Sequence, residues 1–361
     1  MALDRVRNDA YAAALAPVVT PDSVVLDLGA GTGVMGLMAA RLGARHVYLV
    51  EPSDVLCVAE EIVAVNGLQD RVTCLRGRLE DVVVPEKVDV IVSVMTGNFL
   101  LTEDLLPVLF HARDTLLKPG GHLVPDAAVM RAVPVSAAST YDLHIAGWSV
   151  AQHGVDLGSG RAYAANTVHY GQTLQRDAAY LAEPRTLLSL DFLTATYDPL
   201  HCRVDFEAVT RAECHGLAGW FDMRLGDTWL STSLASPQTH WSVAYLPVDP
   251  PMLFEQGDHV SLELDRLPEG DWNWRVKGPR ESRRQSTMLG APISPEKLLK
   301  ARQTYVPPVT EPLAVAAFVL ADVDGVRDVT TIAHRLQQAF PSRFATVQDA
   351  LAFVQRVLVS F

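Results

Sequence analysis

A glycine-rich loop constrains the fold of this chain more than any other feature, because it joins a short apolar strand directly to a helical segment. The run Val24-Val25-Leu26-Asp27-Leu28 is followed at once by Gly29-Ala30-Gly31-Thr32-Gly33. Glycines at such a junction allow the backbone to approach a ligand closely, with the N-terminus of the next helix behind it. The spacing of Gly31, Gly33 and Gly36 also fits a dinucleotide fingerprint, so the glycines alone do not identify the ligand.

The alternation of strands and helices continues from residue 24 to residue 133. Short β-branched apolar runs alternate with helical patterns, which is typical of a parallel sheet with crossover helices. We expect strands over 24–28, 47–50, 72–75 and 88–92, and helices over 34–42, 54–66 and 103–117. The last helix should end at the turn Lys118-Pro119-Gly120-Gly121. Residues 1–133 are therefore predicted to form a Rossmann-like α/β domain.

Beyond residue 133 the pattern changes to short alternating stretches separated by turn residues. These predict a β-rich, barrel-like domain over 134–275, with strands over 187–192, 203–209, 229–234, 241–246 and 260–264. A polar, poorly periodic excursion lies at about 153–184, and either a long loop or an arm to a partner subunit fits it. Residues 276–296 lack an apolar period and predict a linker, and residues 297–361 predict a small helical appendage.

Composition and charge limit the classes of function. A chain of 361 residues with 49 % hydrophobic and 20 % charged residues indicates folded domains rather than a disordered or fibrous protein. The net charge of −12 argues against sequence-independent binding to nucleic acid or to an anionic membrane. No apolar run approaches the roughly 20 residues of a membrane span, and the four cysteines show no metal-site spacing. We therefore expect a cytoplasmic protein with reduced thiols and no metal.

Three acidic residues distinguish between the possible ligands of the glycine loop. Asp27 precedes the glycines, where it would repel a pyrophosphate but would bind the amino group of S-adenosyl-L-methionine. Glu51 ends the second predicted strand, from which a carboxylate can accept hydrogen bonds from both ribose hydroxyls. Glu80 follows the third strand and could accept from an adenine amino group. Either glutamate could instead be a solvated loop acid, but the whole set, with Gly29, Gly31 and Gly33, favours S-adenosylmethionine.

From Met1 to about Asp265 the sequence resembles the protein arginine methyltransferases. The matching motifs are residues 4–11, the loop 93–103, the turn 117–121, Gly219-Trp220-Phe221-Asp222 and Thr239-His240-Trp241. The resemblance implies a class I methyltransferase in which Arg7 binds the cofactor carboxylate and Glu51 and Glu80 bind ribose and adenine. It also implies that His240 pairs with Asp4, and that the excursion at 153–184 is the arm of a homodimer.

The sequence departs from the family where the chemistry occurs. The family loop carries two glutamates, of which Glu103 matches the second, while Val94 replaces the first. Two carboxylates are the natural clamp for a guanidinium, which stays charged at neutral pH, and Val94 removes half of that clamp. Thr96 and Asn98 stand where the family has methionine and an aromatic residue. We expect these three residues and Trp241 to border the acceptor pocket, although barrel packing is the simpler role for Trp241.

The leading hypothesis is therefore an S-adenosylmethionine-dependent methyltransferase acting on a non-standard acceptor, a peptide or a small-molecule metabolite. The acceptor atom is nitrogen in the first instance, with oxygen or carbon as alternatives. Glu103 would orient or deprotonate the nucleophile, with His240 as the second group or as a histidine that merely bridges two domains. One alternative is an arginine or guanidino methyltransferase with a replacement acid near Val94, a role for which Asp104 would point elsewhere. Another is a catalytically silent cofactor-binding scaffold.

The C-terminal segment has a weak resemblance of its own. Helical patterns at 313–320, 331–340 and 346–359 resemble small winged-helix modules that hold precursor peptides in bacterial peptide-modifying systems. A helical cap packed on the barrel is the simpler interpretation.

Overall fold

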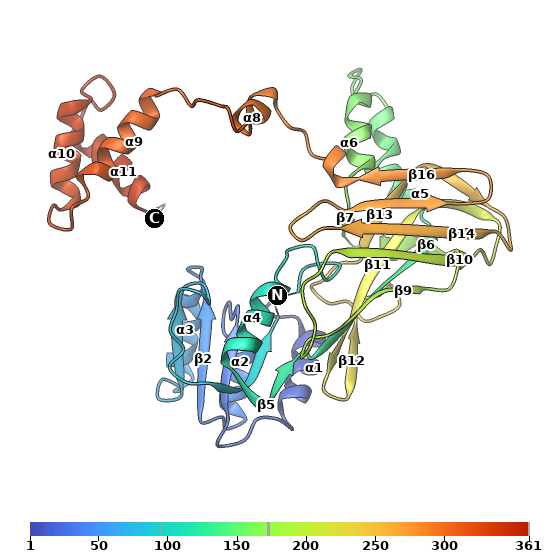
Figure 1. Ribbon diagram of the computed structural model, residues 1–361, viewed down its shortest axis with the longest axis horizontal. Coiled ribbons are helices and arrows are strands. Elements are labelled where there is room, and N and C mark those ends of the chain that lie inside the picture. Colours follow the sequence, from blue (N-terminus) through green and yellow to red (C-terminus); the bar gives the residue numbers. More distant parts are fainter. Residues whose placement is uncertain (95, 172–173, 360–361) are drawn as a thin grey trace. The chain divides into compact units, whose positions relative to one another are not determined.

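The apolar run before the glycine loop becomes the central strand of a parallel sheet in the computed structural model, which describes residues 1–94, 96–171 and 174–359. The strands lie in the order β3-β2-β1-β4-β5 and are all parallel. Figure 1 labels β2 and β5 of this sheet. Their bounds are β1 Val24–Leu28, β2 His46–Glu51, β3 Val72–Arg76, β4 Val88–Ser93 and β5 Leu117–Val124. The connecting helices are α2 Val34–Arg41, α3 Leu56–Val65 and α4 Leu106–Leu116. The predicted Rossmann-like fold is confirmed.

Two details of this layer differ from the sequence-based expectation. The predicted turn at Lys118–Gly121 lies within β5, where Leu117 pairs with Val88 and His122 pairs with Val90. The proline and glycines are accommodated as an irregularity of the strand, with Gly120 at a φ of 77°. The helix predicted from residue 103 begins only at Leu106, because Asp104 adopts a left-handed φ of 51°.

An N-terminal helix, α1 Arg5–Leu15, packs beside the parallel sheet and reaches the second layer. The hydroxyl of Tyr11, which is fully buried, donates to the carbonyl of Ser93 at 2.9 Å and contacts the sulfur of Met223. The helix therefore joins the end of β4 to the antiparallel strands that follow in the sequence.

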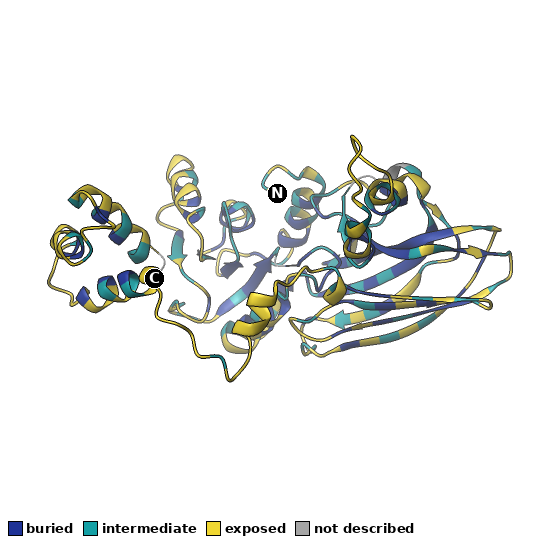
Figure 2. Cartoon of the chain, turned by 90° about the horizontal axis from the view of Figure 1, so that it is seen from above, coloured by how far each residue is buried: buried dark blue, intermediate teal, exposed yellow. Residues whose placement is uncertain are grey.

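Two antiparallel sheets form the second layer. One has the order β10-β14-β15-β16, and the other has the order β7-β13-β11-β6-β8, with β12 paired to β11 and β9 paired to β6. The strands are β6 Ala127–Ser136, β7 His169–Tyr170, β8 Ala179–Tyr180, β9 Arg185–Asp191, β10 Leu200–Glu207, β11 Ala212–Leu225, β12 Thr228–Ser231, β13 Ala244–Phe254, β14 His259–Arg266, β15 Asn273–Lys277 and β16 Ser282–Ser286. The predicted β-rich domain is confirmed, and Figure 2 shows buried residues concentrated along the strands of both layers.

The predicted domain boundaries need two corrections. The boundary at residue 133 falls inside β6, which begins at Ala127 and pairs with β11 along its length. The predicted linker 276–296 contains β16, which pairs with β15. This strand carries the polar sequence Ser-Arg-Arg-Gln-Ser, so no apolar alternation marks it.

A helical insertion separates β6 from β9. It contains α5 Ala138–His144, the 3-10 turns η1 Ala146–Ser149 and η2 Gly158–Gly160, α6 Arg161–Ala165 and α7 Leu174–Asp177. The predicted arm at 153–184 lies within this insertion, apart from residues 172–173, which lie outside the described residues. Buried residues of the insertion, among them Tyr141, Ile145 and Ala165, pack with strands β6, β11 and β13 in a separate hydrophobic core.

The chain divides into two units, Met1–Pro292 and Ile293–Phe361. The second unit contains α8 Pro295–Lys300, α9 Glu311–Asp322, α10 Val329–Ala339 and α11 Val347–Leu358. Val315, Ile332, Leu336 and Val354 are among the residues of its core. The predicted helical appendage is confirmed, but residues 293–359 contain no strand, so the resemblance to a winged helix does not extend to a wing.

Candidate functional site

A cavity of about 280 Å³ lies at the carboxyl end of β1, beside the glycine loop. Five of the predicted site residues line it, namely Arg7, Asp27, Gly29, Gly31 and Val94. The remaining lining residues are Met1, Ala2, Ala30, Thr32, Val34, Met35 and Val55. The position agrees with the general rule that ligands of open parallel sheets bind at the carboxyl ends of the strands.

The glycine loop has a backbone conformation that side chains disfavour. Gly29, Gly31 and Gly33 have φ values of 69°, 55° and 78°, in the left-handed region. The amides of Gly29 and Ala30 both donate to the carbonyl of Val50, at 2.9 and 3.0 Å. The loop is thereby fixed against the end of β2, and Gly33 serves as the cap of α2 rather than as a wall of the cavity.

Gly36 allows α2 to pack closely on the sheet. A Cβ at this position would lie 2.3 Å from Leu49 Cδ2 and 3.1 Å from Asp27 Cβ. The close approach lets the Gly36 amide donate to Asp27 Oδ2 at 2.7 Å. This glycine therefore serves packing and the orientation of Asp27 together.

Asp27 is a buried carboxyl group with 2 % of its surface exposed. Burial raises its pKa to about 7, and nearby Glu51 adds to the rise, against the Gly36 hydrogen bond and the positive charge of Arg7. A cationic group bound in the cavity would favour the ionised form. The site is therefore suited to the amino group predicted from the sequence.

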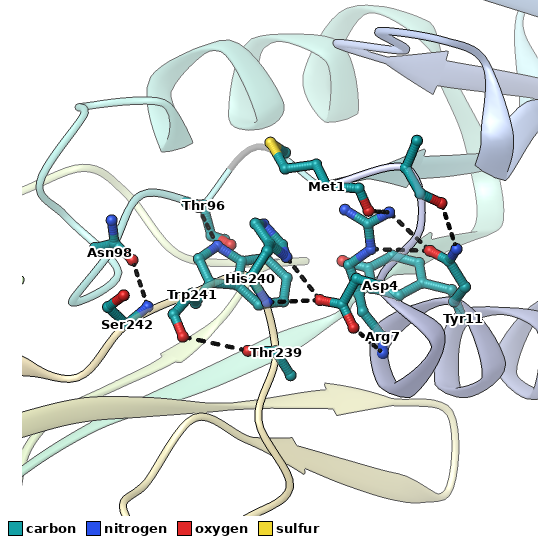
Figure 3. Close-up of polar contacts among 12 residues, drawn as sticks. Met1, Asp4, Arg7, Tyr11, Thr96, Asn98, Thr239, His240, Trp241 and Ser242 are labelled. Carbon is teal, nitrogen blue, oxygen red and sulfur yellow. Dashed lines mark hydrogen bonds and ion pairs between the residues drawn. The ribbon is translucent and has the colours of Figure 1, made fainter. Parts of the chain in front are cut away.

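Arg7 lies on the same cavity as Asp27 and carries the opposite charge. It is 3 % exposed, and its Nη2 donates to the Met1 carbonyl at 3.1 Å and to Asn8 Oδ1 at 2.7 Å (Figure 3). A buried guanidinium and a buried carboxyl group that line the same cavity match a ligand that carries both a carboxylate and an ammonium group. The residues present therefore fit the amino-acid end of the expected cofactor.

The two predicted glutamates occupy different environments. Glu51 Oε2 accepts from the Gly31 amide at 3.0 Å, and Oε1 accepts from the amide and hydroxyl of Ser53 at 3.0 and 2.6 Å. Glu51 is therefore oriented at the rim of the glycine loop with acceptor capacity remaining. Glu80 lies exposed on the turn after β3 and does not line the cavity. Its predicted contact with adenine stays a prediction.

Asp4 and His240 are in contact, as the resemblance implied. Asp4 Oδ2 accepts from His240 Nδ1 at 2.9 Å and from the His240 amide at 2.7 Å, while Oδ1 accepts from the Arg7 amide at 3.1 Å (Figure 3). Burial lowers the pKa of His240 despite the neighbouring Asp4. Burial alone would raise the pKa of Asp4, but the hydrogen bonds from Arg7 and His240 outweigh it and lower the pKa. His240 is therefore neutral near pH 7, with its proton on Nδ1 and a lone pair on Nε2.

The β4–α4 loop, described at residue 94 and over residues 96–105, is held by residues of the second layer. Trp241 Nε1 donates to the Thr96 carbonyl at 2.8 Å, and the Ser242 amide donates to Asn98 Oδ1 at 2.8 Å (Figure 3). Trp241 is 5 % exposed and packs edge-on against Phe221. These contacts assign Trp241 to packing between the layers. Thr96, Asn98 and Trp241 do not line the cavity, whereas Val94 does.

Phe99 and Gly219 form a contact that the sequence analysis missed. A Cβ on Gly219, in β11, would lie 2.5 Å from the Phe99 ring, and this ring also packs on Trp272 at a centroid distance of 5.0 Å. Gly219 begins the motif Gly219-Trp220-Phe221-Asp222, so its position within a buried strand was the available signal.

Glu103 is exposed at the end of the same loop and packs against Gly97, where a Cβ would lie 3.1 Å from Glu103 Cβ and Cγ. The side chain of its neighbour Asp104 forms an ion pair with Arg266. Among the described residues that line the cavity, Asp27 is the one carboxyl group. Among the described residues that line this cavity, none other than Asp27 could supply a carboxylate in place of the glutamate that Val94 replaces. The described residues also contain no group of three or more side chains able to hold a metal ion.

Two family models match the chain. Residues 126–276 match the arginine methyltransferase oligomerization subdomain, and residues 25–121 match a methyltransferase domain. Probable protein arginine N-methyltransferase 6 of Arabidopsis thaliana is 34 % identical over 307 residues, with 75 % of this chain and 70 % of that protein covered. Histone-arginine methyltransferase CARMER of Drosophila persimilis is 31 % identical over 289 residues, and the chain spans only 54 % of its length.

Solved structures agree with these matches. A Trypanosoma brucei PRMT1 enzyme–prozyme heterotetrameric complex with AdoHcy has a TM-score of 0.70 at 27 % identity, covering 78 % of this chain and 95 % of that one. Arabidopsis thaliana protein arginine methyltransferase 10, in an open conformation, has a TM-score of 0.66 at 27 % identity, covering 78 % and 94 %. The similarity thus extends over both layers of the first unit.

Proposed function

We propose that the chain, which belongs to the protein arginine methyltransferase family of class I S-adenosylmethionine-dependent methyltransferases, methylates a nitrogen of an acceptor other than protein arginine. The acceptor class is a peptide or a small-molecule metabolite whose reacting nitrogen is neutral or weakly basic. The single observation that carries the proposal is the apolar Val94 in the wall of the cofactor cavity, without a replacement acid beside it.

The first requirement of the reaction is a site for the methyl donor, which we assign to the cavity beside the glycine loop. We assign Arg7 to the cofactor carboxylate, Asp27 to its amino group and Glu51 to its ribose, on the charges and positions described above. The bound cofactor supplies an electrophilic methyl group on a sulfonium. The protein then has to orient a nucleophilic lone pair, exclude water and accept any proton released.

The acceptor half of the site has one assigned carboxylate. Glu103 lies on the β4–α4 loop that also carries Val94, and one carboxylate suffices to orient or deprotonate a neutral nitrogen nucleophile. A guanidinium stays charged at neutral pH and has five donors, so Val94 would leave part of it desolvated and unpaired. Val94 thus favours an uncharged acceptor group. His240 is the second candidate group, through Nε2.

The guanidino group of arginine is the second candidate acceptor, because the relatives are named as arginine methyltransferases. It would need a second acid near Val94. Asp104, which is adjacent to Glu103, is the acid considered for this role, but both of its oxygens are bound by Arg266. Arginine methylation would therefore need a clamp built in another way.

The test is a methyl-transfer assay with radiolabelled S-adenosylmethionine and a matched set of acceptors. Peptides of one sequence would carry arginine, histidine, lysine or asparagine at the central position, and small primary amines and imidazoles would complete the set. We expect a non-guanidino acceptor to be methylated faster than the arginine peptide, and Glu103→Gln to lower turnover roughly 10² to 10⁴-fold with cofactor affinity unchanged. Preferred methylation of the arginine peptide would support the second candidate instead.

A homodimer is part of the proposal, because the chain carries the family's oligomerization subdomain. An apolar groove of about 440 Å³ lies on the face of α1, α2 and the segment after α3, lined by Ala12, Val34, Leu37, Met38, Arg41, Leu42, Asn66 and Leu68. The helical insertion exposes large apolar side chains, including Trp148, Val150, Val155 and Tyr163. We infer that the insertion of one subunit docks in the groove of the other.

We also place the protein in the cytoplasm, which agrees with its four free cysteines.

A further inference from the structure

We propose that Asp104 is a positioning residue for Glu103, held by an ion pair with Arg266 at the end of β14. The inference rests on the proposed role of Glu103 in methyl transfer. The residue pair joins the β4–α4 loop to the second layer at the position that follows the predicted acid.

Asp104 is bound from three directions. Arg266 Nη1 donates to Asp104 Oδ1 at 2.8 Å, and Nη2 donates to Oδ2, so the pair is bidentate. The Tyr197 hydroxyl and the Glu269 amide, the latter at 2.9 Å, also donate to Oδ1. Arg266 is 5 % exposed and lies over the Trp272 ring at 5.2 Å. A planar guanidinium clamped in this way fixes a carboxylate in both position and orientation.

The electrostatics agree with this geometry. Burial alone would raise the pKa of Asp104, but hydrogen bonds from Arg266, Tyr197 and Glu269 lower it to about 2. Asp104 is therefore ionised over the whole working range of pH, and the ion pair persists throughout that range.

The backbone of the loop needs such restraint. Phe99, Leu100 and Asp104 all have positive φ values, of 52°, 59° and 51°, which residues other than glycine rarely adopt. Such conformations persist only where surrounding contacts impose them. Among the described residues no hydrogen bond fixes the Glu103 side chain itself. Its position therefore depends on the backbone at Asp104 and on Thr102, whose hydroxyl bonds that of Tyr170 at 2.8 Å.

The first experiment measures the loop directly and needs no acceptor. Amide hydrogen exchange of residues 96–105 would be followed in the wild type, Asp104→Ala and Arg266→Gln, each saturated with S-adenosylhomocysteine. We expect both variants to accelerate exchange in this loop on the order of tenfold or more, with exchange in β1 unchanged. Asp126→Asn is the matched control, because it disrupts another bidentate Arg–Asp pair, with Arg224, remote in sequence from the loop. Unchanged exchange of the loop in both variants would overturn the proposal.

The second experiment separates positioning from general support of the fold. Turnover would be measured with the acceptor that the wild-type protein methylates fastest in the peptide and amine set described above. We expect Asp104→Ala to lower kcat on the order of tenfold in the wild-type background and less than about twofold in the Glu103→Gln background, with cofactor affinity unchanged. Equal losses in the two backgrounds would show that Asp104 does not act through Glu103.

The two experiments also distinguish this inference from the proposed function. If Glu103→Gln leaves turnover unchanged, the proposed role of Glu103 fails, while the exchange data still decide whether the ion pair holds the loop. If Glu103→Gln lowers turnover and the losses are additive, the positioning role alone is wrong. Where Asp104→Ala does not fold, Arg266→Gln breaks the same pair from the other layer and takes its place.

Discussion

Asp4 Oδ2 accepts hydrogen bonds from both the amide and the Nδ1 of His240, at 2.7 and 2.9 Å, while Asp4 also caps α1. One carboxylate therefore fixes the start of the helix that carries Arg7 and the segment of the second layer that precedes Trp241. The contact brings the cofactor cavity and the antiparallel sheets together through residues 236 positions apart.

Acid should weaken this junction. The pKa of His240 is lowered by burial, so the unfolded chain binds a proton more readily than the folded one, and stability is lost as pH falls below about 6.5. The lowered pKa of Asp4 also makes stability fall as pH falls, in this case below about 3.8. Urea unfolding of the wild type and His240→Asn at several pH values tests this. The free energy of unfolding of the variant should decline less than that of the wild type between pH 7 and 5. Identical pH profiles of the two proteins would contradict the assignment.

Asp4→Ala should destabilise the protein by roughly 1 to 3 kcal/mol, because it removes an N-cap and two hydrogen bonds between the layers. Asp328→Ala is a useful control, since Asp328 caps α10 in the other unit without joining two layers. The urea midpoint of the first unit should move only for Asp4→Ala. Cofactor affinity should fall as well, because Arg7 lies in the first turn of α1.

Cofactor affinity should depend on the ionisation of Asp27. Since its pKa is about 7 in the unliganded protein and a bound ammonium group favours the carboxylate, affinity should fall as pH drops below 7. The stability of the unliganded protein should change with pH in the opposite direction. Because the pKa of Asp27 is raised in the folded state, its contribution to stability falls as pH rises toward 7. Calorimetry with S-adenosylmethionine from pH 5.5 to 8.5 measures the effect.

Asp27→Asn should bind 10 to 100-fold more weakly at pH 8 and lose the pH dependence, since a charge-assisted hydrogen bond contributes roughly 1.5 to 3 kcal/mol. Glu51→Ala should weaken binding comparably, and the exposed Glu61→Gln should change nothing. Wild-type affinity in both site variants would remove these residues from the cofactor site.

Gly219→Ala should loosen the β4–α4 loop, because the added Cβ would collide with the Phe99 ring. Overpacking of this kind costs about 1 to 3 kcal/mol. Combining it with Phe99→Leu provides the check, since a smaller side chain should recover part of the stability lost in the single variant. If the loss of stability in the double variant equals or exceeds the sum of the two single losses, the two residues are not in conflict.

The dimer prediction concerns the groove on α1 and α2. Leu37→Asp in the groove and Trp148→Asp on the insertion should each give monomers in sedimentation velocity at micromolar concentration, because each places a charge in an apolar contact. Val209→Asp is the control, an exposed apolar residue outside both surfaces. A wild-type chain that sediments as a monomer would contradict the assembly.

Much of the fold could be predicted from the sequence, because its local patterns and its tertiary contacts agree. The strand from Val24 to Leu28 and the glycine turn after it were predicted at the correct residues, since burial on both faces gives an apolar run that Asp27 alone interrupts. The sequence does not predict β16 because the strand is polar, and it predicts a turn at Lys118–Gly121 because proline and glycine usually end regular structure. Local sequence signals cannot show that a neighbouring strand will accept these residues.

The site divides in the same way. Of the residues predicted to bind the cofactor, Arg7, Asp27, Gly29 and Gly31 line one cavity, whereas Gly33, Glu51 and Glu80 do not. The Asp104–Arg266 pair was not predicted, because its two residues lie 162 positions apart and neither belongs to a motif. Long-range pairs of this kind follow from the fold rather than from any local pattern.

Val94→Glu restores the second carboxylate of the acceptor site and so probes the proposed role of Val94. Methylation of the arginine peptide and of the preferred non-guanidino acceptor would be measured side by side for both proteins. Val94→Glu should lower kcat/KM for the preferred acceptor, because an added carboxylate places an unpaired charge against an uncharged group. Efficient arginine methylation by the wild type, improved by Val94→Glu without loss for any other acceptor, would contradict this role.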